Sequence, residues 1–176
     1  MSSLPFIQAG NSSLFEVDND LREWITLIRR HIHRFPELSF NEFKTSAFIQ
    51  EKLHELEISP QTGIGTTGVI AVLGEGSGPC VALRADMDAL PVSEQTGLEF
   101  ASEHHGIMHA CGHDGHAAML LGAGALLKRI PELPGRVKLV FQPAEEHGNG
   151  ACRLVQEGVV DDVEAIFAGH IDTHFD

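Results

Sequence analysis

Apolar side chains near the start of the chain recur at helical spacing. One face of this stretch carries Leu21, Trp24, Ile25, Ile28 and Ile32. The spacing predicts a helix from about residue 21 to residue 34. Asp18 or Asn19 can cap its first turn, and Pro36 disfavours helical geometry at Phe35. We expect His31 and His33, in the last turn, to interact with the helix dipole rather than with a metal.

A second helix is predicted to open at Asn41-Glu42 and to end before Pro60. Its apolar face carries Phe43, Ala47, Phe48, Leu53 and Leu56. Further along, a helix over residues 115–129 would carry alanine, glycine or leucine on almost every side, which predicts that it is buried. A short helix is predicted over 151–157, where Gly158 can serve as the C-cap.

Four short runs rich in β-formers predict strands. They are residues 68–73, 80–85, 136–142 and 163–168. The first two are apolar on both faces, as in a sheet covered on both sides, and the six-residue connection 74–79 predicts that they pair as a hairpin. The elements therefore alternate as α α β β α β α β. This order predicts an α/β fold with a mixed, mostly covered central sheet flanked by helices.

Length, composition and charge indicate one acidic globular domain. The 176 residues are 43% hydrophobic and 21% charged, and the formal net charge is −13. Residues 1–17 are expected to be a loose leader, and 18–176 the domain. Since the twelve Lys and Arg form no basic patch, we expect neither nucleic acid nor a membrane as a partner. Three isolated cysteines and the lack of a signal-like or membrane-spanning stretch predict a cytoplasmic protein.

The densest chemistry lies between residues 109 and 116, HACGHDGH. Cys111 and His113 are two residues apart on a turn that leads into the buried helix, so their side chains can converge. A thiolate and an imidazole together suit a cation such as zinc. The alternative is a polar loop whose cysteine is only a small buried hydrophobe.

Other candidate groups follow the predicted strands. Asp86 follows the second strand, Glu145 and Glu146 follow the third, and His170 follows the fourth. Because α/β sheets bind ligands beyond the carboxyl ends of their strands, one site built by several loops is expected. Its metal ligands would be Cys111, His113, Glu146 and His170. Adjacent side chains of an extended backbone point to opposite sides, so Glu145 could face a bound water as a general base while Glu146 binds metal.

Four blocks of the sequence closely resemble the di-metal amidohydrolases of the aminoacylase/carboxypeptidase family. They are residues 33–39 (HRFPELS), 84–91 (RADMDALP), 108–116 (MHACGHDGH) and 142–146 (QPAEE). Within that family they resemble the branch with hippurate hydrolases, N-acetyl-diaminopimelate deacetylases and auxin-conjugate hydrolases.

The resemblance implies a zinc-exopeptidase-like catalytic domain that hydrolyses N-acyl amino acids or similar peptide-like amides with metal-activated water. It implies two divalent ions, zinc or manganese foremost, with cobalt and nickel open. It also implies the four ligands named above, Glu145 as the general base, and Asp86 as a carboxylate that orients a ligand. Family members continue past the segment that holds His170, where many have proline in place of Thr173. We therefore expect the N-terminal part of such an enzyme, without its dimerisation or lid domain.

Two other interpretations stay open at this point. The chain could be a non-catalytic remnant that binds metal or a partner subunit without turnover. A homo-oligomer or a complementing C-terminal polypeptide would then cover exposed sheet edges. A redox protein that uses Cys111 is a weaker alternative, since there is no resolving cysteine nearby in the sequence.

Overall fold

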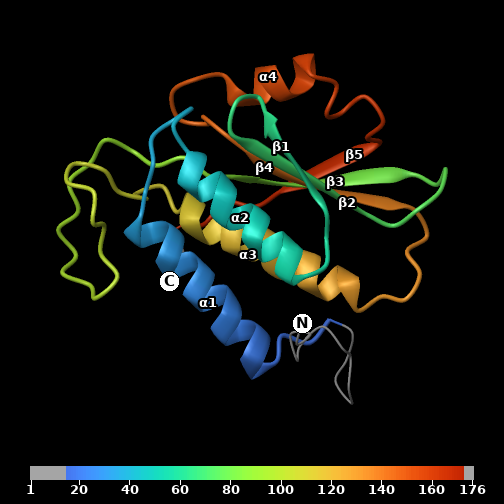
Figure 1. The fold of residues 1–176 in the computed structure, drawn as a ribbon, viewed down its shortest axis with the longest axis horizontal. Helices are drawn as coiled ribbons and strands as arrows, with labels where there is room; N and C mark the ends of the chain where they lie inside the picture. The colour runs from blue at the N-terminus through green and yellow to red at the C-terminus, as the bar shows by residue number, and fades with distance from the viewer. Residues whose placement is uncertain (1–14, 173–176) are drawn as a thin grey trace.

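The computed structural model describes residues 15–172, which form a three-layer α/β structure (Figure 1). The helices are α1 (Asn19–Arg34), α2 (Phe43–Glu55), α3 (His113–Lys128) and α4 (Gly150–Gln156). The strands are β1 (Pro60–Ile64), β2 (Gly68–Leu73), β3 (Cys80–Asp86), β4 (Arg136–Gln142) and β5 (Ala165–Ala168). Most of the leader predicted for residues 1–17 lies outside the described residues.

The predicted fold class and four helices are confirmed. Helix α1 begins behind Asp18, whose carboxylate accepts a hydrogen bond from the Leu21 N–H at 2.9 Å. Helix α3 begins at His113, two residues earlier than expected. It is buried along most of its length between α1 and the sheet, and its Gly122 lets the Ile25 side chain approach closely.

The sheet is mixed, in the order β1-β2-β4-β3-β5. The β1–β2 and β2–β4 pairs are antiparallel, and β3 is parallel to both β4 and β5. The predicted hairpin of β2 and β3 is therefore wrong, because β4 lies between them. The connection 74–79 instead turns beside the start of β4, where the Arg136 N–H donates to the Pro79 carbonyl at 2.8 Å.

Strand β1 was not predicted from the sequence. Its residues, Pro-Gln-Thr-Gly-Ile, have no apolar alternation, and the three central ones are exposed. Proline and glycine are tolerated in such a strand because β1 lies at the sheet edge and contains an irregularity between Thr62 and Ile64.

Two apolar clusters cover the two faces of the sheet. The larger joins α1, α2 and α3 to the sheet, and Leu53, Leu121 and Phe141 are fully buried in it. The smaller lies on the opposite face, where Leu154 of α4 packs against Ile70 and Val140. None of the helices within residues 15–172 is long and apolar enough to cross a membrane.

The parallel strands determine where the site can form. Because β3, β4 and β5 run in the same direction, their carboxyl ends lie at one edge of the sheet. The loops after them, and the turn before α3, all open at that edge. This is the usual location of a ligand site in a sheet of this type.

Candidate metal centre

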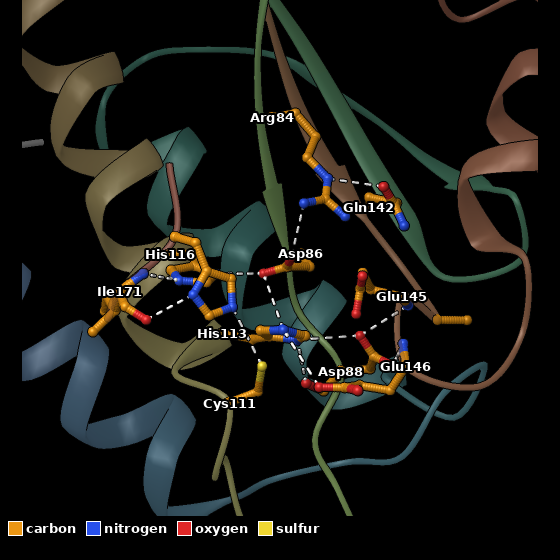
Figure 2. Close-up of polar contacts among 12 residues, drawn as sticks. Arg84, Asp86, Asp88, Cys111, His113, His116, Gln142, Glu145, Glu146 and Ile171 are labelled. Carbon is orange, nitrogen blue, oxygen red and sulfur yellow. Dashed lines mark hydrogen bonds and ion pairs between the residues drawn. The ribbon is translucent and has the colours of Figure 1, made fainter. Parts of the chain in front are cut away.

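Three sets of side chains with metal-ligand chemistry meet at this edge of the sheet (Figure 2). Within each set, one potential ligand atom per residue lies within 4.8 Å of the others. The sets are Cys111–His113–His170, His113–Glu145–Glu146 and Asp86–His113–His116. His113 belongs to all three and is therefore the centre of the arrangement. The structure thus brings together all six residues predicted for the site.

The turn before α3 brings Cys111 and His113 together. Gly112 has a φ of 89°, in the left-handed region that glycine adopts without a steric penalty. His113 then begins the helix and is almost fully buried, whereas Cys111 is partly exposed. On a regular helix, side chains two residues apart would not face each other.

Hydrogen bonds orient the two predicted histidine ligands. The Nδ1–H of His113 donates to the Asp88 carbonyl at 2.8 Å, and its Nε2 lies 3.7 Å from the Glu146 Oε1. The Nδ1–H of His170 donates to the Ile171 carbonyl at 2.6 Å, and its Nε2 lies 3.4 Å from the Cys111 Sγ. In both rings Nε2 is left with a lone pair that faces other potential ligands, as in metal-bound histidines.

Glu145 and Glu146 lie in a turn and not in an extended backbone. Ala144, just before them, has a φ of 48°, and its N–H donates to the buried Glu42 carboxylate at 2.8 Å. The two glutamates consequently converge on His113. The expectation that they point to opposite sides is wrong, because it assumed that the strand geometry of β4 continues past Pro143.

A buried carboxylate, Asp88, holds this turn against the rest of the site. Its two oxygens accept hydrogen bonds from the N–H groups of Glu145 and Glu146, both at 3.0 Å. It also accepts from the Ser39 hydroxyl at 2.6 Å and lies 3.3 Å from the His113 Nδ1. Burial raises the pKa of Asp88, but these hydrogen bonds outweigh burial and lower it to about 2. Asp88 is therefore a carboxylate with every oxygen engaged.

Asp86, which is predicted to orient a ligand, has different partners from Asp88. Asp88, not Asp86, contacts the Nδ1 side of His113, whereas Asp86 lies on its Nε2 side at 3.6 Å. Asp86 instead accepts the Nδ1–H of His116 at 2.6 Å. The sequence shows both carboxylates at a strand end, but their spacing of two does not reveal which one reaches which imidazole nitrogen.

The donor set fits a divalent cation. The Glu146 Oε1 is buried and has no hydrogen-bond partner among the described residues. Burial and the nearby Glu146 carboxylate raise the pKa of the Cys111 thiol to about 12. A bound cation would supply the missing positive charge, accept the Glu146 oxygen as a ligand and stabilise the thiolate.

A cavity of about 890 Å³ lies beside these groups, between α1, α3 and the loop 92–110. Cys111 and His170 line one side, and Leu98 and Met108 provide apolar surface. His109 also lines the cavity, and burial lowers its pKa to about 4, so its ring is neutral. The site therefore opens onto a space large enough for a small organic substrate.

His33 connects α1 to the first turn of α3 and to the loop 92–110. Its Nδ1 lies 2.9 Å from the Asp114 carboxylate and its Nε2 lies 3.2 Å from Glu94. Besides the expected interaction with the helix dipole, His33 thus has two carboxylate partners that are distant in the sequence. The hydrogen bond to Asp114 is the largest influence and raises the pKa of His33 above its ordinary value of 6.5, against the opposing effect of burial.

A raised pKa makes the contribution of His33 to stability depend on pH. Protonated His33 donates to both carboxylates, so its stabilisation is complete below pH 6.5 and is lost as pH rises through the raised pKa. We expect His33→Gln to flatten the decline of the unfolding free energy above pH 6.5, measured by urea denaturation at several pH values. The exposed His54 offers the matched control, His54→Gln. Equal slopes in the wild type and His33→Gln would contradict the assignment.

Comparison with known proteins places the chain in a family. The sequence profile of Peptidase family M20/M25/M40 matches residues 82–175, more than half of the chain. The chain belongs to this peptidase family. The matched segment of this M20-family chain contains every residue of the three candidate ligand sets.

Its relatives include several hydrolases. The chain is 48% identical to the N-acetyl-L-cysteine deacetylase of Bacillus subtilis, over 96% of this chain and 42% of that protein. It is 50% identical to the IAA-amino acid hydrolase ILR1-like 6 of Arabidopsis thaliana, over 84% of this chain and 32% of that protein. The chain thus spans less than half the length of the curated relatives that it matches.

A solved structure supports the fold assignment. The Bacillus subtilis YXEP protein, described as a dinuclear metal-binding peptidase from the M20 family, superposes with a TM-score of 0.84 at 44% identity. The match covers 89% of this chain and 45% of that one. The mixed sheet and its helices are therefore those of the corresponding part of an M20 peptidase.

Proposed function

We propose that this M20-family chain forms the metal-binding part of an amidohydrolase that cleaves N-acyl amino acids or similar peptide-like amides. One observation carries the proposal: Cys111 and His170 join His113 in one candidate ligand set, and Glu145 and Glu146 join it in another. In the second set the buried Glu146 Oε1 has no hydrogen-bond partner among the described residues. The relatives also support it, since one is a deacetylase of an N-acyl amino acid and another a hydrolase of amino acid conjugates.

In this proposal Cys111, His113, Glu146 and His170 hold two divalent ions. A bound ion of this kind lowers the pKa of water and polarises a carbonyl oxygen. The thiolate and imidazole donors favour zinc, and the carboxylates also suit manganese. Asp88 keeps the Nδ1 proton on His113, which leaves Nε2 available as a donor to the ion.

Glu145 would move the proton. It is exposed at the mouth of the site and yet lies in the same candidate set as His113 and Glu146. A carboxylate in this position can take a proton from the attacking water and deliver it to the leaving nitrogen. The adjacent cavity would receive the acyl amino acid, with Leu98 and Met108 contacting its apolar part.

A second candidate is metal binding without turnover, in association with a partner chain. The edge strand β5 favours it, because Ile166 and Phe167 are 52% and 59% exposed there. Exposed apolar edge strands invite pairing with another chain. The partner would be a second copy or a polypeptide that completes the M20 fold. For either candidate we propose a reducing compartment, in keeping with three cysteines that are all free.

Metal analysis combined with an activity assay tests these proposals. We expect the chelator-stripped chain to regain divalent metal on addition of Zn²⁺ or Mn²⁺. At a free-metal concentration of about 100 times Kd, this binding should stabilise the fold by about 2.7 kcal/mol. Plasma mass spectrometry, thermal unfolding and hydrolysis of N-acetyl amino acids measure the three quantities. Metal binding with hydrolysis supports the first candidate, and binding without hydrolysis supports the second. If the chain binds no more metal than His113→Ala, both are wrong.

A further inference from the structure

His116 has contacts that differ from those of the two histidines proposed as ligands. It is 3% exposed, and both of its ring nitrogens are engaged by protein groups. Its Nδ1–H donates to the Asp86 Oδ1 at 2.6 Å, and its Nε2 accepts the Ile171 N–H at 2.9 Å. Figure 2 shows the ring between these two partners. A backbone N–H can only donate, so the Nε2 lone pair of His116 is occupied by this hydrogen bond.

These two hydrogen bonds belong to a longer chain of contacts. The Nη1–H of Arg84 donates to the Asp86 Oδ2 at 2.8 Å, and its Nε–H donates to the Gln142 Oε1 at 2.8 Å. This series of hydrogen bonds therefore starts at the ends of β3 and β4 and passes through Asp86 and His116 (Figure 2). It ends at the backbone that follows β5.

The segment at the end of this series of hydrogen bonds carries His170. Residues 169–172 have no regular secondary structure and are exposed. The Ile171 side chain is 43% exposed and packs against the start of α3 near Gly112 and Gly115. The hydrogen bond from the Ile171 N–H to His116 is thus a partly buried polar anchor for a segment that is otherwise mostly in solvent. One residue earlier, the His170 Nε2 faces the Cys111 Sγ.

We propose that His116 is a positioning residue that holds the 169–172 segment so that His170 reaches the metal centre beside Cys111. This inference rests on the proposed function, because it assumes that Cys111 and His170 bind metal. The competing interpretation is that His116 is itself a ligand, since it forms a candidate set with Asp86 and His113. Its two engaged nitrogens favour the positioning role.

A double-mutant cycle on the chain separates these roles. Co²⁺ affinity would be measured by competition with a chromogenic chelator, and the thiolate-to-Co²⁺ charge-transfer band and the d–d bands would report on geometry. We expect His116→Ala to weaken Co²⁺ binding by about 10–100-fold, as is usual for residues that orient ligands. His170→Ala should weaken it at least as much. The double variant should bind no more weakly than His170→Ala, because without His170 the anchor has nothing to position.

Two amide variants test the anchor directly. His116→Gln keeps an acceptor near the position of Nε2 for the Ile171 N–H, whereas His116→Asn keeps only a donor toward Asp86. We expect the glutamine variant to retain most of the Co²⁺ affinity and the d–d spectrum, and the asparagine variant to resemble His116→Ala. His54→Ala, on an exposed position of α2, is the matched control. Metal-free thermal unfolding of every variant reports any general loss of structure.

Each outcome has a defined meaning. If the losses of His116→Ala and His170→Ala multiply in the double variant, His116 acts independently as a ligand or structural residue, and the proposal is wrong. Wild-type affinity in His116→Ala also overturns it. If instead the wild type binds no more Co²⁺ than Cys111→Ala, the proposed function itself has failed.

Discussion

Replacing Glu145 by glutamine is expected to slow hydrolysis of an N-acyl amino acid by about 10²–10⁴-fold, the usual contribution of a general base. Glutamine keeps the shape of the side chain but cannot accept a proton from water. Glu145 is exposed, and its proposed role does not require it to bind metal. The metal content of Glu145→Gln, measured by plasma mass spectrometry, should therefore equal that of the wild type.

The adjacent residue provides the matched control. Glu146 has a buried oxygen without a hydrogen-bond partner among the described residues, so it is the carboxylate suited to hold metal. Glu146→Gln should lose metal and activity together, whereas Glu145→Gln should lose activity alone. A Glu145→Gln variant that keeps the wild-type rate would remove Glu145 from the mechanism. One that loses metal would make Glu145 a ligand.

The helices could be predicted from the sequence because local signals agree at their ends. In α1, Asp18 caps the first turn and Pro36 follows the last, and a single apolar face lies between them. Strands β2, β3 and β4 were also recognised from their apolar runs. Their pairing was not, because periodicity identifies an element without naming its neighbours. The short connection 74–79 suggested a hairpin, yet β4 lies between the strands.

The meeting of the candidate ligands was predictable for a similar reason. They follow strands or precede a helix, and parallel strands bring such positions to one edge. The finer roles of the carboxylates were not predictable. Asp86 and Asp88 are equally plausible from spacing alone, and only the fold places Asp88 under His113 and Asp86 against His116. The convergence of Glu145 and Glu146 likewise depends on the left-handed Ala144.

Asp88→Ala should destabilise the chain by about 3–5 kcal/mol, the cost of removing one partner from a buried charged network. Asp88 is 1% exposed, and its removal would leave the N–H groups of Glu145 and Glu146 without their acceptor. Ser39 and His113 would lose a partner as well. Urea unfolding measures the effect, with Asp161→Ala at an exposed position as the control, expected within about 0.5 kcal/mol of wild type.

Two further measurements separate charge from shape at Asp88. Asp88→Asn preserves the volume and one acceptor oxygen, but its NH₂ group would face a backbone donor, so we expect an intermediate loss. The lowered pKa means that the stabilisation by the carboxylate is complete above pH 3.8 and declines only as the pH falls toward about 2. The wild type should therefore lose stability toward pH 2 more steeply than Asp88→Asn. If Asp88→Ala were as stable as Asp161→Ala, Asp88 would not be holding the Glu145–Glu146 turn, and another contact would have to place both glutamates beside His113.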